Sequence, residues 1–406
     1  MADNKNNNER NVPPLRFPEF SGEWKKCTIG ELAIKVGSGV TPRGGESVYK
    51  MDGHPFVRSQ NVGLGHLILD DIAFIDEETH LRQKSTELKL EDVLLNITGA
   101  SIGRSALVNE QVVGGNVNQH VCIIRTKESL IPSFLCNFLL SNYGQRQIDS
   151  FQAGGNRQGL NFEQIKSIKI AIPSTKEQTK VAKLLQLIEE RIATQNKIIE
   201  DLKKLKSAIS KQVFAQKPSG SNRLDSLFSK GKAGGTPTST NKEYYNGEIP
   251  FLSINDITKQ GKYVRYTENH LSQSGLENSS AWVVPKYSLI MSMYASVGLV
   301  TINEIPITTS QAMFAMQLKN KDLLDYLYYY LSYFKYRHIH KYLETGTQSN
   351  INADIVRGIM IPTYGHSRNM EISSTLQGID VKIDNELSVL KLFNRQKNYL
   401  LSQMFI

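Results

Sequence analysis

The chain has 406 residues, enough for two or three domains, and 40% of them are hydrophobic, enough to form buried cores. Its formal charge of +9 points to a polyanionic partner. The sequence contains no run of about 18 apolar residues, the length that predicts a membrane span. The opening MADNKNNNERN lacks the apolar segment of a signal peptide.

The cysteines indicate the compartment. Cys27, Cys122 and Cys136 are odd in number and form no CxxC pair. Such a set favours buried free thiols over a disulfide framework, so we expect a cytoplasmic protein.

The first part of the chain predicts a disordered tail and then a globular block of mixed α and β structure. The polar residues 1–15 form the tail, and the block covers residues 16–175. A helix is expected from Pro132, because proline suits a first helical turn and apolar spacing follows it. The expected strands are residues 54–62, 91–99, 120–126 and 168–173.

A long helix follows at residues 176–217, with apolar side chains repeating on a seven-residue rhythm. Spacings of three and four place them on one stripe, whose polar exceptions are Gln195 and Lys206. The predicted seam of this helix is Val181, Leu185, Ile188, Ile192, Ile199, Leu202, Lys206, Ile209 and Val213. Pro218 and Gly220 then mark a linker over residues 218–222.

The second half repeats this plan. A second block at residues 223–365 places GGTP and ASVG 195 residues after GVTP and ASIG of the first block. A second long helix, residues 366–406, repeats the seam at an offset of 191. Its seam is Ile372, Leu376, Ile379, Ile383, Glu386, Leu390, Phe393, Lys397, Leu400 and Met404. Between the anchors the blocks differ, which favours two modules that do one job on different targets.

An apolar seam must meet another helix, and pairing the two copies within one chain is the simplest solution. We therefore predict an intramolecular antiparallel coiled coil in which Lys206 faces Glu386, Gln195 faces Lys397 and Ile199 faces Phe393. The alternative is a parallel coiled coil between two chains. The predicted fold class is α+β: two similar mixed α/β domains separated by two long helices, with internal pseudo-two-fold symmetry.

The sequence predicts no catalytic or metal site. It contains no GxxxxGK[ST] phosphate loop, no zinc spacing and no [ND]PP[YF] methyltransferase loop. Asp76 with Glu87 and Lys89 loosely fits a nuclease pattern, but a solvated charged helix is favoured. His338 and His340 are two residues apart and diverge on a helix.

The chain does carry residues of the kinds that read base edges and hold phosphates. They gather at predicted turns of both blocks. The candidates in the first block are Arg43, Arg58, Gln60, Asn61, Arg104, Asn118, Gln119, Arg157 and Gln158. The candidates in the second block are Asn255, Lys259, Lys262, Arg265, Tyr294, Gln311, Gln348 and Asn350. Any one of them alone is more simply a solvated loop residue, whereas the set favours double-stranded DNA.

The chain resembles the specificity subunits of type I restriction–modification enzymes over nearly all its length. The matching motifs are the opening LRFPEFSGEW, the G-x-TP turns, the I-x-IP closings, and helix ends QVF and QMF. The pair Glu177–Gln178 near the start of the first helix also matches, whereas the second helix has Arg368–Asn369 nearby.

The resemblance implies two target-recognition domains, each reading one half of a split, asymmetric DNA sequence, with the helices as conserved spacers. It implies no activity of the chain alone and no cofactor bound by it. Two modification subunits would carry S-adenosylmethionine, and restriction subunits with translocase and nuclease activity would use ATP and Mg. Rival hypotheses are a stand-alone methyltransferase or nuclease with cryptic motifs, and a coiled-coil scaffold that binds only proteins.

Overall fold

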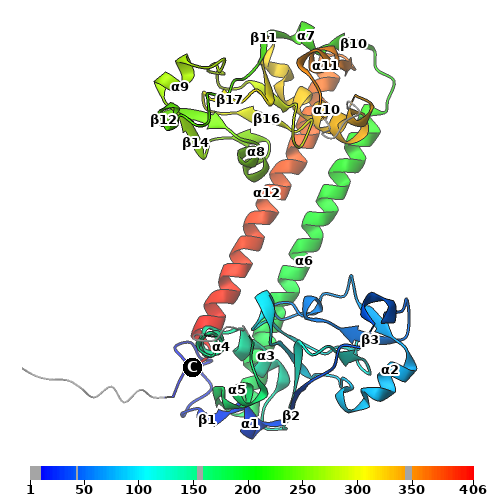
Figure 1. Cartoon of the computed structure of the whole chain (residues 1–406), viewed down its shortest axis with the longest axis vertical. Coiled ribbons are helices and arrows are strands. Elements are labelled where there is room, and N and C mark those ends of the chain that lie inside the picture. The colour runs from blue at the N-terminus through cyan, green and yellow to red at the C-terminus, as the bar shows by residue number, and fades with distance from the viewer. Residues whose placement is uncertain (1–10, 43, 153–158, 343–349) are drawn as a thin grey trace, which may run out of the picture. The chain divides into compact units, whose positions relative to one another are not determined.

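The computed structural model describes residues 11–42, 44–152, 159–342 and 350–406. It divides into two compact units, residues 1–197 with 388–406 and residues 198–387. Each unit contains one globular domain together with parts of both long helices, α6 (Thr175–Phe214) and α12 (His366–Gln403) (Figure 1).

The domain of the first unit is built on antiparallel and mixed sheets with short helices. Its strands form three sheets, ordered β2-β8-β5-β6, β4-β3-β7 and β1-β9. The strands are β1 (Lys25–Thr28), β2 (Ala33–Ser38), β3 (His54–Val57), β4 (Ala73–Ile75), β5 (Val93–Asn96), β6 (Ser105–Leu107), β7 (Asn116–Val117), β8 (Val121–Thr126) and β9 (Lys169–Ile172). The helices are α1 (Ile29–Leu32), α2 (Glu77–Arg82), α3 (Pro132–Leu140), α4 (Asn142–Ser150) and α5 (Phe162–Ser167).

The domain of the second unit repeats this topology with one added edge strand. Its sheets are ordered β11-β18-β15-β16-β13, β14-β12-β17 and β10-β19. The strands are β10 (Gly220–Arg223), β11 (Phe228–Ala233), β12 (Tyr245–Leu252), β13 (Tyr263–Val264), β14 (Asn269–Leu271), β15 (Leu289–Ser292), β16 (Val300–Asn303), β17 (Thr308–Thr309), β18 (Met313–Leu318) and β19 (Met360–Thr363). The helices are α7 (Leu224–Leu227), α8 (Ile254–Gln260), α9 (Gln273–Glu277), α10 (Leu324–Arg337) and α11 (Ala353–Gly358).

The larger sheet of each domain is buried on both faces, which explains its nearly continuous apolar strands. Successive side chains of a strand point to opposite faces. In the first domain Val93 and Leu95 pack in the core that contains α3, whereas Leu94 packs in a second core with residues of the smaller sheet. In the second domain Met291 and Ile290 divide in the same way.

Each long helix belongs to both cores. Leu185 of α6 packs in the main core of the first domain, and Phe214, at the other end of α6, packs in the main core of the second. Helix α12 runs the opposite way, with Leu376 in the second core and Phe405, just beyond its end, in the first. The intramolecular antiparallel pairing is therefore confirmed. All the predicted seam residues of both helices are buried or half-buried.

The predicted register is wrong. In the structure Lys206 pairs with Asp380 (Nζ–Oδ1 2.5 Å) rather than Glu386, and Lys397 pairs with Glu189. Each acid lies six residues before the predicted partner, a shift of nearly one heptad.

A shift close to one heptad still brings apolar seam positions together, so the hydrophobic pattern does not distinguish these registers. The acids that distinguish the registers are Glu189 and Asp380, each one residue after a seam isoleucine. Such flanking carboxylates reach a seam lysine while they keep part of their hydration, as the 23% exposure of both acid side chains shows.

The motif at the start of α6 is a buried polar junction. Arg16 donates to both carboxylate oxygens of Glu177 at 2.7 and 2.8 Å, and Trp24 Nε1 donates to Oε1 at 3.3 Å. Beside it the Gln178 side chain accepts from Ile131 N at 2.8 Å. The opening motif and the helix start therefore meet in the fold, because two buried polar residues need partners.

The cysteines follow their prediction in part. Cys122 and Cys136 are buried free thiols, and Cys27 is half-buried. Burial raises the pKa of Cys122 to about 12 and that of Cys136 to about 11, which keeps both thiols protonated. Within the described ranges, no helix has the length and hydropathy needed to cross a membrane.

A substitution just beyond the end of α12 tests whether this helix is anchored in the core of the first domain. Phe405 is fully buried, with ring centroids 5.1 Å from Phe134 and 6.2 Å from Phe138. We expect Phe405→Ala to lower the free energy of unfolding by about 3–5 kcal/mol, because a buried ring leaves a cavity. Urea denaturation measures the loss. Tyr399→Ala, which removes an exposed ring from the same helix, is the control and should change stability by less than about 0.5 kcal/mol. Equal effects would contradict the assignment of Phe405 as an anchor.

Candidate nucleic-acid interface

Most of the predicted DNA-contacting residues that the structure describes in the first domain lie in or beside three turns, and hydrogen bonds join these turns. The turns are Ser59–Asn61 after β3, Gly99–Ser101 after β5 and residues 118–120 before β8. They surround a shallow depression of about 500 Å³ whose described lining is Ser59, Gln60, Thr98, Gly99, Ala100, Ser101, Arg104 and His120.

Asn61 shapes the first turn from inside. It is 1% exposed, its Oδ1 accepts from Arg58 N at 3.0 Å, and its Nδ2 donates to Ile68 O at 2.9 Å. Both halves of the amide are therefore engaged with the backbone, which assigns Asn61 a positioning role rather than a base contact.

The neighbours of Asn61 share an acidic partner. Gln60 Nε2 donates to Asp71 Oδ2 at 2.6 Å, and the Arg58 guanidinium donates to the same carboxylate at 3.1 Å. Arg58 also lies over the ring of Tyr49, at 5.3 Å from its centroid. Gln60 is exposed, whereas the Arg58 side chain is 20% exposed and is held by Asp71 and Tyr49. Gln60 is therefore the more accessible of the two candidates.

A buried asparagine that the sequence analysis missed connects the first two turns. Asn96 Nδ2 donates to Ser59 O at 2.8 Å and to Ser101 Oγ at 3.0 Å. Gly99 and Gly103 adopt positive φ angles of 73° and 84°, a conformation that glycine takes without strain. Arg104 follows directly and is exposed.

The third turn connects to the GVTP segment. Gln119 Oε1 accepts from Thr41 N at 3.1 Å, while Thr98 Oγ1 and His120 Nδ1 are 2.6 Å apart. Asn118 is buried, and its Oδ1 accepts from His120 N at 3.0 Å, so it too holds its turn. Arg43, Arg157 and Gln158 lie outside the described residues.

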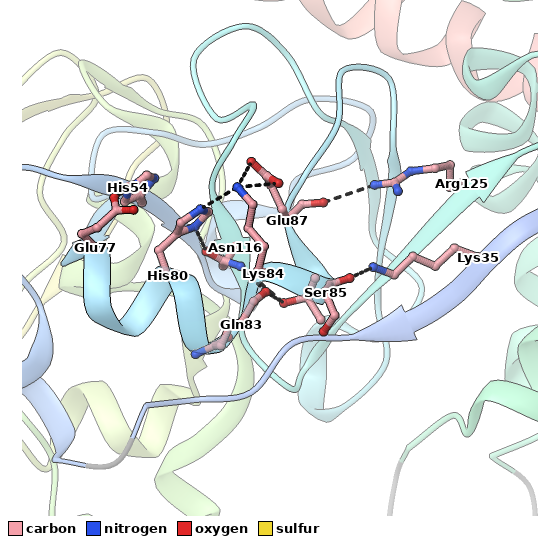
Figure 2. Close-up of polar contacts among 11 residues, drawn as sticks. Lys35, His54, Glu77, His80, Gln83, Lys84, Ser85, Glu87, Asn116 and Arg125 are labelled. Carbon is pink, nitrogen blue, oxygen red and sulfur yellow. Dashed lines mark hydrogen bonds and ion pairs between the residues drawn. The ribbon is translucent and has the colours of Figure 1, made fainter.

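Figure 2 shows a polar network beside α2 that includes His80, Gln83 and Asn116. The His80 ring stacks on His54 at 3.8 Å between centroids, and its Nδ1 lies 2.7 Å from Asn116 Oδ1. Asn116 Nδ2 donates to Gln83 O at 3.0 Å, and Gln83 Oε1 accepts from Val40 N at 3.4 Å. These residues were not predicted, because their contacts join segments far apart in the sequence.

The residues of the loose nuclease pattern have structural roles. Asp76 caps α2 by accepting from Thr79 N at 2.9 Å, and Glu87 pairs with Lys84 at 3.0 Å. Both contacts stabilise local turns. Among the described residues, no group of three or more His, Cys, Asp or Glu side chains is arranged to hold a metal ion.

In the second domain all three predicted cations pair with acids. Lys262 is nearly buried, 2.6 Å from Asp325, and its Nζ lies 4.4 Å from the ring centroid of Tyr329. It therefore holds β13 to α10 and is not presented to a ligand.

The other cations lie nearer the surface. Lys259 pairs with Glu268 and Arg265 with Glu304. The hydrogen bond from Lys259 holds the pKa of Glu268 below its usual value. Asn255 Nδ2 also donates to Glu268, at 3.0 Å.

Two predicted residues of the second domain remain exposed at matching turns. Gln311 Oε1 accepts from the Thr236 hydroxyl, and in the first domain Gln119 Oε1 accepts from the backbone N–H of Thr41. Tyr294 is 42% exposed and precedes Ala295 and Ser296, whose φ angles of 38° and 44° are strained for residues with a Cβ.

The last two candidates lie after α10. Asn350 is half-buried, and its neighbour Ile351 donates to Met293 O at 3.0 Å, which places it beside the Tyr294 turn. Gln348 lies outside the described residues.

Comparison with known proteins gives consistent matches. Residues 21–204 and 218–389 each match the family model described as type I restriction modification DNA specificity domain. The putative type I restriction enzyme MjaX specificity subunit of Methanocaldococcus jannaschii is 22% identical over 399 residues, covering 93% of this chain and 91% of that protein. The HindI specificity subunit of Haemophilus influenzae is 32% identical over 95 residues, 23% and 20% of the two chains.

Solved structures share the fold. A chain from a study of complex assembly and conformational transition of the type I R-M system superposes with a TM-score of 0.61 at 18% identity, covering 96% of this chain and 98% of that one. The S subunit of a type I restriction-modification system from M. genitalium superposes with a TM-score of 0.59 at 15% identity, covering 97% and 99%.

The positioning role of Asn61 is testable against its neighbour. Asn61→Ala leaves backbone groups of the turn without partners, so we expect the free energy of unfolding to fall by about 1–3 kcal/mol. Gln60→Ala removes an exposed side chain and should change it by less than about 0.5 kcal/mol. Urea denaturation followed by circular dichroism measures both. A neutral Asn61→Ala would show that this amide does not hold the turn.

Proposed function

Because the chain belongs to the type I restriction modification DNA specificity family, we propose that it is the sequence-specific DNA-recognition subunit of a type I restriction–modification complex. Each globular domain reads one half of a bipartite, asymmetric site. A protein-only scaffold is not favoured, because both family matches are to DNA specificity domains.

One observation carries the proposal: the two domains share a framework but differ in what their turns expose. Gln119 and Gln311 make matching framework contacts to the threonines of the two G-x-TP segments. Beside them, one domain exposes Arg104 and the other exposes Tyr294. Base pairs are distinguished by such side chains, whereas the framework sets their orientation. Two different half-sites are therefore expected.

We propose that the chain itself carries no catalytic group and binds no cofactor. Two modification subunits with S-adenosylmethionine would methylate the site after flipping the target base out of the duplex. Restriction subunits with ATP and Mg would join them. Because the proposed ligand is cellular DNA, the proposed location is the cytoplasm.

The outer faces of the long helices are suited to partner subunits. Each helix has exposed apolar residues spaced eleven and then seven residues apart, which places them on one face because these steps are close to three and two turns. These residues are Leu187, Ile198 and Leu205 on α6, and Val381, Leu392 and Tyr399 on α12. Exposed apolar stripes of this kind mark surfaces that a partner covers.

The independence of the two domains is tested by exchange. Residues 17–170 are replaced with the matching block of another family member, and the chain is expressed with its modification and restriction subunits. Methylome sequencing should then show a change in only one half of the methylated sequence. Retention of both halves, or a change in both, would contradict two independent readers.

Arg104 is the exposed cation of the first depression. We expect Arg104→Ala to weaken binding to the cognate duplex by about 1–3 kcal/mol if it reads a base, with relaxed specificity at one position. If it holds a phosphate, binding should fall for all sequences and the salt dependence should decrease. Fluorescence anisotropy at several salt concentrations separates the two. Lys169→Ala, on strand β9, is the matched control, and an effect equal to that of the control would remove Arg104 from the interface.

A further inference from the structure

The second unit contains a pocket of about 370 Å³ between α6, α10 and α12 that is separate from the reading turns. Tyr333 and Tyr336 of α10 line it together with Ile383 of α12, and Ser207 lines it from α6. No residue of the candidate nucleic-acid interface lines it. The pocket is therefore distinct from the surface that the duplex would contact.

The aromatic lining has the composition of a protein-binding site. The Tyr336 side chain is 78% exposed, and tyrosine with arginine is enriched among residues that dominate protein interfaces. Ser207 and Ser210 are small, which leaves room for a large side chain between the helices. An apolar or aromatic side chain from a partner would bury these rings.

The charge of the pocket favours an acidic partner. Lys203, Lys206 and Arg337 line it, against one carboxylate, Asp380. Asp380 is already engaged, since Lys206 Nζ lies 2.5 Å from Oδ1 and the Tyr329 hydroxyl donates to Oδ2 at 2.8 Å. Lys203 and Arg337 are exposed and remain as the excess positive charge.

The first unit differs at the repeat-related positions. There Lys397, the counterpart of Lys206, donates to the carbonyl of Leu64 at 3.0 Å, so the chain's own loop supplies the acceptor. The counterpart of Tyr336 is Gln145, whose side chain donates to Gly103 O at 3.0 Å and Leu139 O at 2.6 Å. The tyrosine-lined pocket is thus a feature of the second unit.

We propose that this pocket receives an acidic segment of a modification subunit, with a large apolar side chain against Tyr333 and Tyr336 and a carboxylate on Lys203 and Arg337. The identity of the partner rests on the proposed function. Because the rings and both cations belong to the second unit, the pocket strengthens the docking of one of the two modification subunits.

The test titrates the full chain with the modification subunit of its own system and follows the complexes by analytical ultracentrifugation. The variants are Tyr336→Ala and the double change Lys203→Glu with Arg337→Glu. Lys321→Glu, an exposed charge reversal on the same domain, is the control. We expect at least a tenfold weakening of one binding step in both variants and less than a twofold change in the control. Affinity of the chain alone for its cognate duplex should stay within twofold.

Three results would overturn the proposal. Unchanged binding of the modification subunit by both variants, with the unaltered chain binding normally, would remove the pocket as a docking site while leaving the proposed function intact. Weaker duplex binding with unchanged subunit binding would assign the pocket to nucleic acid. Failure of the unaltered chain to bind the subunit would overturn the proposed function, and the occupant with it. Thermal unfolding of each variant checks that the fold is kept. We expect no loss of stability, because all altered side chains are exposed.

Discussion

The apolar seam shared by α6 and α12 is the interaction on which the rest of the structure depends. Each helix begins in one core and ends in the other, with Phe214 and Phe405 as repeat-related anchors. Removing this much apolar surface from water is the main favourable term that holds either helix in place. Neither domain core is complete without residues from both helices.

The two lysine–carboxylate pairs select the register of the two helices, which the apolar contacts alone leave open. Lys206 with Asp380 and Lys397 with Glu189 occupy equivalent positions of the repeat. Each pair also reaches its domain, through the Tyr329 hydroxyl in one unit and the Leu64 carbonyl in the other. Partly buried charges cost desolvation, and that cost is offset only when the partner is in place. The pairs therefore favour one register among those that the heptad pattern permits.

The duplication separates framework from specificity. Repeat-related glutamines accept hydrogen bonds from the threonines of both G-x-TP segments, and the four strands that the larger sheets share have the same order. The exposed residues at the turns differ. A protein that recognises two unlike half-sites needs this division, because the orientation of a reading turn must be kept while its side chains change.

The sequence was least informative about which of the candidate DNA-contacting residues are exposed. Asn61, Asn118 and Lys262 belong to residue types that read DNA, but each is turned inward. Hydrogen bonds to the backbone of their own turns hold Asn61 and Asn118, and contacts to α10 hold Lys262. Conversely, Asn96 joins two turns and was missed, because a single asparagine after an apolar strand gives no pattern.

The duplication, the seam residues and the mixed α/β character of the domains follow from the amino-acid pattern alone, because periodicity is local to each segment. The register of the helices and the exposure of the polar side chains depend on the tertiary fold. Registers one heptad apart bury the same apolar residues, and whether a polar side chain turns inward depends on the backbone groups and charges that the fold places beside it.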